Sequence, residues 1–191
     1  MKLILASKSE GRKKLLEEAG YTFKAVESGF DESEVETEDF EKHEDYAKHL
    51  ALSKAMLVAF EKDEGIIIGA DTMVVFDGAL FGKPKTPEEA IKVLTLLSGK
   101  WHEIITGIAV INTETQEKAV DVVKSRVKFK KLSKKQIEDY VATGEPLKKA
   151  GGYDISNGAK NFVEKIEGSE TNICGLPMER LSEILKRMAS S

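Results

Sequence analysis

Residues 2–27 have the sequence KLILASKSEGRKKLLEEAGYTFKAVE, which contains the patterns of a strand, a helix and a second strand. The apolar run at residues 2–6 is typical of a buried strand. Ser9 is placed to cap the helix, because a serine oxygen can accept a hydrogen bond from a backbone N–H of the first turn. Gly20 ends the helical pattern, and residues 21–27 alternate in polarity as a strand does. The chain therefore opens with a strand–helix–strand unit.

The rest of the chain continues this alternation. Helices are predicted over residues 44–62, 87–98 and 133–141 and from residue 177 onward. Strands are predicted over residues 66–70, 73–76, 79–81, 101–112, 120–130 and 162–166. The pair Asp77 and Gly78 is typical of a tight hairpin. The helix at 44–62 is expected to bury an apolar stripe formed by Tyr46, Leu50, Leu57 and Phe60.

Length and composition favour one large domain or two small lobes that share a core. The chain has 191 residues, of which 41% are hydrophobic and 32% are charged. A domain of this size buries roughly 70% of the surface that its unfolded chain exposes, so it needs no disulfide framework and no structural metal. The sequence contains no repeat, linker or low-complexity tract. We therefore expect a single domain over residues 1–191 with a mixed α/β fold.

Cysteine usage and hydropathy exclude several classes of protein. Cys174 is the single cysteine, so no internal disulfide can form. The sequence has no signal-type N-terminus and no apolar stretch near the ~18 residues of a membrane span. These features predict a reducing, cytoplasmic setting and no membrane partner.

The charge balance argues against nucleic acid as a partner. The net charge is −4, whereas nonspecific binding of nucleic acid needs an excess of basic residues. Residues 27–45 contain ten acidic residues and one lysine, and residues 118–135 contain eight basic residues and one aspartate. Two interpretations stay open. Either both stretches are solvated faces, or part of the acidic stretch holds a divalent cation while basic side chains elsewhere hold an anion.

The first candidate site lies at the junction of the first strand and the first helix. Arg12, Lys13 and Lys14 oppose the partial positive charge of the helix N-terminus. A bound phosphate would offset this, because backbone N–H groups, the hydroxyls of Ser7 and Ser9 and a basic side chain would converge on it. The alternative is that these cations point to water. The glycine spacing of a P-loop is absent.

Three further side chains are candidates. Asp71 closely follows an apolar run, and ligands gather at the carboxyl ends of strands in open α/β sheets, so Asp71 is a candidate base or metal ligand. The alternative is that it caps a turn. Lys54 lies on the predicted apolar stripe, where a cation either extends to solvent or faces a buried anionic site. Lys83 lies in a loop, as a surface residue or as a substrate contact.

A series of short motifs runs through the chain. They are Ala6-Ser7-Lys8-Ser9 with Arg12, Gly69-Ala70-Asp71-Thr72, Gly82-Lys83-Pro84, Leu97-Ser98-Gly99 with His102, Thr106-Gly107, Gly144-Glu145-Pro146 with Lys149-Ala150-Gly151 and Tyr153, and Gly175-Leu176-Pro177. Each motif is weak alone, but their order and spacing together are highly specific. The chain resembles the Maf family of nucleotide pyrophosphatases nearly from end to end.

This resemblance implies an α/β fold (mixed α+β) like that of inosine triphosphate pyrophosphatases, with a long twisted mixed sheet and a cleft between two lobes. It also implies a homodimer that hydrolyses a nucleoside triphosphate to the monophosphate and pyrophosphate. The implied cofactor is a divalent cation, Mg²⁺ or Mn²⁺. Water is expected to attack the α-phosphorus, because pyrophosphate leaves intact.

The resemblance also implies roles for individual residues. Asp71 is the implied proton acceptor, and Glu32 and Asp71 are the implied metal ligands. Arg12, Lys54 and Lys83 are the implied cations around the phosphates. Further substrate contacts are implied at Ser7, Ser9, Thr72, Lys149 and Ser156.

The chain departs from the family pattern at positions linked to base choice. Gly11 stands where the family usually has Arg, and Ser156 stands where the pyrimidine-selective subgroup commonly has Gln. Thr72 agrees with the subgroup that prefers dTTP and UTP, and the markers of the subgroup for methylated GTP are absent. The expected substrate is dTTP, UTP or a modified pyrimidine nucleotide. Two other functions stay open: a non-catalytic regulator of cell division that binds nucleotides or protein, and an inosine or xanthosine triphosphate pyrophosphatase.

Overall fold

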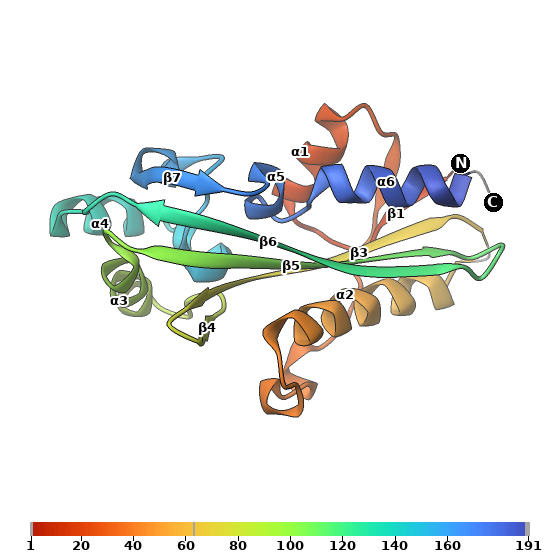
Figure 1. Ribbon diagram of the computed structural model, residues 1–191, viewed down its shortest axis with the longest axis horizontal. Coiled ribbons are helices and arrows are strands. Elements are labelled where there is room, and N and C mark those ends of the chain that lie inside the picture. Colours follow the sequence, from red (N-terminus) through yellow and green to blue (C-terminus); the bar gives the residue numbers. More distant parts are fainter. Residues whose placement is uncertain (1, 63, 190–191) are drawn as a thin grey trace. The chain divides into compact units, whose positions relative to one another are not determined.

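The computed structural model describes residues 2–62 and 64–189 (Figure 1). The chain forms two compact units. Unit 1 comprises Met1–Thr72, Thr106–Val123 and Gly175–Ser191, and unit 2 comprises Met73–Ile105 and Lys124–Cys174. The expectation of a single domain stays a prediction. Within the described ranges, no helix is both long and apolar enough to cross a membrane.

A seven-stranded sheet has the order β2-β1-β3-β5-β6-β7, with β4 paired to β3. The strands are β1 (Leu3–Leu5), β2 (Phe23–Ala25), β3 (Ile66–Phe76), β4 (Ala79–Phe81), β5 (Trp101–Asn112), β6 (Lys118–Phe129) and β7 (Val163–Glu167). β1 is parallel to β2 and β3, whereas β4 is antiparallel to β3 and β7 is antiparallel to β6. The predicted mixed α/β class with a mixed sheet is confirmed. The cleft between two lobes stays a prediction.

Unit 1 has two cores, one on each face of its strands. Its helices are α1 (Glu10–Glu18), α2 (His43–Phe60), α6 (Met178–Ala189), η1 (Glu32–Glu34) and η2 (Thr37–Asp39). Leu3 and Leu5 of β1 pack with Leu16 of α1 and with the buried side of α6. Ile4 packs on the other face with Ala55 of α2. Successive side chains of a strand leave opposite faces, so Leu3 and Leu5 contact one layer of helices and Ile4 contacts the other. Figure 1 shows α1 and α6 on one side of these strands and α2 on the other.

α2 lies close to the strands because two residues opposite it are glycines. A Cβ at Gly69 would lie 2.3 Å from the carbonyl oxygen of Ala51, and a Cβ at Gly107 would lie 2.1 Å from that of Ala47. Either substitution would force the helix away from the sheet, because the colliding atoms are backbone atoms. The glycines therefore set the height of α2 above β3 and β5.

This contact decides which face of α2 is buried. Tyr46 and Leu50 are buried as predicted, and Lys54 lies on the same buried side. Leu57 is 45% exposed and Phe60 is 94% exposed, so the predicted stripe is wrong at its C-terminal end. The helix turns its alanines to the glycines of the strands, and Met56, Leu57 and Phe60 are left exposed.

Unit 2 has a separate core around the aromatic ring of Phe129. Its helices are α3 (Pro87–Leu97), α4 (Lys134–Val141), α5 (Glu170–Ile173), η3 (Glu145–Lys148), η4 (Ala150–Gly152) and η5 (Gly158–Phe162). Thr86 and Ser133 cap α3 and α4 with their hydroxyls, as predicted. Asp77 and Gly78 have φ angles of 52° and 76°, which are the left-handed values that a two-residue hairpin needs.

Candidate active site

Two serines organise the N-terminus of α1. Ser9 is the N-cap, and its hydroxyl accepts a hydrogen bond from the backbone N–H of Arg12 at 3.4 Å. The hydroxyl of Ser7 accepts from the backbone N–H of Ser9 at 3.2 Å. The first turn of a helix presents N–H groups and a partial positive charge, so an anion is stabilised there. The predicted cap is confirmed.

The guanidinium of Arg12 is held by three acceptors of unit 1, of which Thr72 and Gly175 are distant in the sequence. Nε donates to the carbonyl of Gly175 at 2.8 Å, Nη1 to the hydroxyl of Ser7 at 3.1 Å, and Nη2 to the hydroxyl of Thr72 at 3.2 Å. A guanidinium has five N–H groups, so two remain for a ligand once these bonds to described residues are counted. A fixed, half-buried guanidinium with paired donors suits a phosphate group.

The hydroxyl of Thr72 is fully engaged within the protein. It accepts from Arg12, lies 3.0 Å from the hydroxyl of Thr106, and donates to the carbonyl of Gly175 at 3.3 Å. A hydroxyl has one hydrogen and two acceptor positions, so with Thr106 as a donor all three are used. Thr106, which is fully buried, was not identified from the sequence, because the motif Thr106-Gly107 gave no chemical role.

A second cluster joins Lys54 of α2 to two carboxylates. The Nζ atom of Lys54 lies 2.5 Å from Oδ1 of Asp71 and 2.6 Å from Oε1 of Glu32. Lys54 and Asp71 are each only 8% exposed, so Lys54 faces a buried anionic site rather than solvent. Burial lowers the pKa of Arg12, and the charges of Asp71 and Glu32 oppose this shift. The two clusters are therefore electrostatically coupled.

Asp71 lies inside a strand, and the prediction that it follows one is wrong. β3 runs without interruption from Ile66 to Phe76. β1 pairs with β3 only as far as Ile68, and β4 pairs with it from Val74 onward, so Asp71 lies between the two paired stretches. Consecutive side chains leave opposite faces of a strand. Asp71 therefore contacts Lys54 of α2, whereas Thr72 contacts Arg12 of α1 on the other face.

Glu32 and Asp71 form a donor set that fits a hard divalent cation. One oxygen of each already contacts the same ammonium group, which shows that both can face one cation. Mg²⁺ is commonly bound through one or two carboxylates together with substrate phosphates and water. Among the described residues, no group of three or more acidic, histidine or cysteine side chains could hold a metal. The pair therefore suits a cation whose remaining ligands come from the substrate.

The remaining predicted substrate residues, Lys83, Lys149 and Ser156, lie in unit 2. Two of their loops are joined by a hydrogen bond from the N–H of Gly151 to the carbonyl of Gly82 at 2.9 Å. Gly151 has a φ of +64°, and a Cβ there would lie 2.6 Å from the side chain of Val74, so the position requires glycine. Lys83 and Ser156 are exposed, and Lys149 is half-buried.

Asp154 is a buried carboxylate of unit 2 that the sequence analysis did not identify as a site residue. Its Oδ2 lies 2.6 Å from Nζ of Lys149, and its Oδ1 accepts a hydrogen bond from the hydroxyl of Ser156 at 2.6 Å. An aspartate two residues before a serine is typical of an Asx turn, and this local pattern is the sequence feature that could have identified Asp154 as a partner of Ser156. Asp154 thus ties together two predicted substrate contacts.

The structure groups the predicted site residues by unit. Unit 1 holds Ser7, Ser9, Gly11, Arg12, Glu32, Lys54, Asp71 and Thr72, and unit 2 holds Lys83, Lys149 and Ser156. Within unit 1, hydrogen bonds or ion pairs join all of these residues except Gly11, which has no side chain, into two clusters. That both groups act on one substrate stays a prediction.

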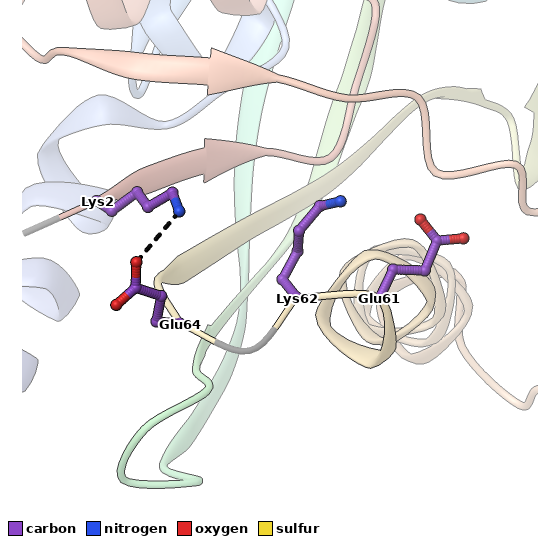
Figure 2. A pocket seen from close by; sticks show the side chains of 4 residues that line it. All are labelled: Lys2, Glu61, Lys62 and Glu64. Atoms are coloured by element: carbon purple, nitrogen blue, oxygen red, sulfur yellow. Dashed lines mark hydrogen bonds and ion pairs between the residues drawn. The ribbon is translucent and has the colours of Figure 1, made fainter.

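A surface hollow in unit 1 lies beside the N-terminal ends of the parallel strands β1 and β3, whereas Asp71 lies further along β3 (Figure 2). It is lined by Lys2, Glu61, Lys62 and Glu64. Lys2 and Glu64 precede these strands and form an ion pair at 3.3 Å, with side chains that are 59% and 67% exposed. Figure 2 shows the four charged side chains that line it, and the two that form the ion pair are more than half exposed. We therefore assign the hollow no catalytic role.

Comparison with known proteins gives consistent matches over the whole chain. The family model described as Maf-like protein matches residues 2–188. A protein from Clostridioides difficile (strain 630) named dTTP/UTP pyrophosphatase is 45% identical over 190 residues, covering 100% of this chain and 96% of that protein. A protein of the same name from Dictyoglomus turgidum is 43% identical, covering 99% and 97%. Among solved structures, a HAM1 protein from Coxiella burnetii is 15% identical, with a TM-score of 0.46 and coverage of 98% and 99%.

Proposed function

The chain belongs to the Maf family, and on this basis we propose that it is a nucleoside triphosphate pyrophosphatase, a hydrolase that acts on an acid anhydride. The relatives that carry the name dTTP/UTP pyrophosphatase support a pyrimidine nucleotide as the substrate. The observation that carries the proposal is the buried pair of Lys54 and Asp71 beside an anchored arginine in one unit. In this unit, Arg12 is suited to bind phosphate and Asp71 is suited to act as a base.

Arg12 and the first turn of α1 would bind the phosphates. A triphosphate carries about four negative charges at neutral pH, and the two N–H groups that Arg12 has left after its three protein contacts suit phosphate oxygens. The contacts to Gly175, Ser7 and Thr72 fix the guanidinium before the substrate arrives. Donors that are already in place stabilise charge that develops in the transition state.

Asp71 would act as the general base. Its Oδ1 contacts Lys54, so its other oxygen would serve both the attacking water molecule and the divalent cation. The water oxygen forms a bond to the α-phosphorus, the bond from that phosphorus to the α–β bridging oxygen breaks, and the water proton passes to Asp71. Pyrophosphate leaves with the bridging oxygen, and the nucleotide is left as the monophosphate.

Glu32 and Asp71 would hold the divalent cation, Mg²⁺ or Mn²⁺. Such a cation neutralises the charge of the leaving group and helps to activate the attacking water. Lys54 would hold the two carboxylates close together and neutralise part of their negative charge. Lys83, Lys149 and Ser156 are the substrate contacts that we assign to unit 2. The cytoplasmic location and the homodimer stay predictions.

The test is a turnover screen with Mg²⁺ or Mn²⁺ and with chelator alone, across dTTP, UTP, CTP, GTP and ITP. Phosphorus NMR identifies the products. We expect monophosphate and pyrophosphate, with dTTP and UTP turned over fastest and no turnover in chelator. Binding without any product would favour the non-catalytic regulator, and faster turnover of ITP would favour a pyrophosphatase for deaminated purines. Release of inorganic phosphate and a diphosphate would contradict attack at the α-phosphorus.

A further inference from the structure

Lys54 lies where the two proposed metal ligands come together. Its Nζ atom is 2.5 Å from Oδ1 of Asp71 and 2.6 Å from Oε1 of Glu32. The side chains of Lys54 and Asp71 are only 10% and 12% exposed, so water has little access to their contact. The two carboxylates therefore already share one cation, and this cation belongs to the protein.

The acidic stretch contributes Glu32 to this group through a turn that is held locally. Glu32 is the first residue of η1, and Asp31 is its N-cap. The Asp31 carboxylate accepts hydrogen bonds from the backbone N–H and the hydroxyl of Ser33 at 2.9 and 2.7 Å. Asp31 is thus engaged within the turn, whereas Glu32 extends to Lys54, 22 residues further along the chain.

The charges of the two clusters balance one another. Lys54 and Arg12 are positive, and Glu32 and Asp71 are negative. Burial lowers the pKa of Arg12, and the charges of Asp71 and Glu32 act in the opposite direction, so both carboxylates interact with both cations. The other acidic residues between 33 and 41 are exposed, and solvent screens their charges. A divalent cation on its own would therefore meet carboxylates whose charge is already compensated.

The protein also supplies few ligands for a cation. Mg²⁺ prefers octahedral coordination by oxygen and usually takes several of its ligands from water and substrate phosphates. Within residues 2–62 and 64–189, no group of three or more acidic, histidine or cysteine side chains could hold a metal. The triphosphate of a nucleotide would add both oxygen ligands and negative charge.

We propose that Lys54 keeps the divalent cation out of the nucleotide-free site, so that the cation enters together with the nucleotide. This inference rests on the proposed function and deepens it by assigning an order of binding. The ammonium repels a second cation and neutralises the carboxylates that would attract it. The triphosphate supplies the missing negative charge and ligands. Lys54 thereby couples metal binding to nucleotide binding.

The test measures Mn²⁺ binding to nucleotide-free protein through the electron paramagnetic resonance signal of free Mn²⁺. Lys54→Met should bind Mn²⁺ at least about tenfold more tightly than the wild type, because the carboxylates keep their charge and lose the ammonium. Adding Glu32→Gln to this variant should abolish the gain. Lys48→Met, which removes a cation of the same helix that pairs with Asp45, is the matched control and should bind Mn²⁺ as the wild type does. An equal gain in Lys48→Met would overturn the inference.

Thermal unfolding of the wild type gives a second readout. Mn²⁺ alone should leave the melting temperature unchanged. Mn²⁺ with a UTP analogue that has a methylene group in place of the α–β bridging oxygen should raise it further than the analogue in chelator does. If Lys54→Met does not fold in chelator, Mn²⁺ alone should restore its circular-dichroism spectrum, since the metal replaces the missing cation.

These measurements need no turnover, so they are separate from the substrate screen. If that screen shows no turnover while Lys54→Met gains Mn²⁺ binding, the proposed activity fails and the exclusion of the cation by Lys54 stands. Nucleotide-free wild type that binds Mn²⁺ as tightly as Lys54→Met would overturn the inference. So would a folded Lys54→Met protein that does not bind Mn²⁺, or an unfolded one that Mn²⁺ does not restore.

Discussion

The ammonium of Lys54 lies 2.5 Å from a carboxylate oxygen of Asp71, and both side chains are buried. The same ammonium contacts Glu32, whose side chain is 51% exposed. The buried carboxylate therefore depends on Lys54 for compensation more than the exposed one does. This relationship makes Lys54 important for folding as well as for the proposed chemistry.

Lys54→Met should lower the free energy of unfolding by about 3 kcal/mol, because it leaves the Asp71 charge buried without its partner. Urea unfolding measures the change. Adding Asp71→Asn to this variant should restore part of the loss. Lys48→Met, on the same helix but in a partly exposed pair with Asp45, should change stability by less than about 1 kcal/mol. Equal losses for the two lysines would contradict the buried pair.

Gly69→Ala should lower both stability and activity. The added Cβ would lie 2.3 Å from the carbonyl oxygen of Ala51, so α2 must move and carry Lys54 away from Asp71. Overpacking of this kind costs about 1–3 kcal/mol or more. Thermal unfolding tests the prediction, with Gly82→Ala as the stability control, because nothing lies within 4 Å of a Cβ at Gly82. A fully stable Gly69→Ala protein would rule out the close approach of α2.

Stability should fall as the pH is lowered from about 6.5 to about 4, in part through His102. Burial lowers the pKa of His102 from 6.5 to about 4 in the folded protein. In this window the unfolded chain binds a proton that the folded chain does not, so acid favours unfolding by up to about 3 kcal/mol. His102→Gln should remove this part of the slope, as measured by urea unfolding at a series of pH values. The same slope in both proteins would exclude His102 as its source.

Arg12→Lys should reduce kcat/KM about 100-fold, because an ammonium cannot make the three protein contacts of the guanidinium and still present paired donors to a phosphate. Steady-state kinetics with UTP measure the effect. Lys14→Gln, which removes an exposed cation from the same helix, is the control and should change kcat/KM less than about threefold. A comparable loss in both variants would mean that the positive charge of the helix, rather than the fixed guanidinium of Arg12, determines phosphate binding.

Local signals explain what could be predicted from the sequence. Ser9 and Ser133 cap helices within a few residues of themselves, and Asp77 with Gly78 closes a turn between adjacent strands. Each of these features depends on neighbours in the chain, so a short window of sequence contains the whole interaction.

Long-range contacts explain the errors and omissions. The exposure of Phe60 follows from how Gly69 and Gly107 receive α2, and no window around the helix contains those glycines. Thr106 gains its role from Thr72, a residue far away in the sequence. The burial of Lys54 cannot be predicted for the same reason, since the periodicity of a helix does not identify the charge opposite it.

Single-turnover release of pyrophosphate from UTP by the wild type and by Asp71→Asn, with Mg²⁺ present, tests directly whether Asp71 is the general base. Asp71→Asn keeps the shape of the side chain but removes the proposed base, so the rate should fall at least about 1,000-fold. Circular dichroism and UTP binding should show an intact fold and site. A folded Asp71→Asn protein that binds UTP and releases pyrophosphate at the wild-type rate would show that Asp71 is not the base.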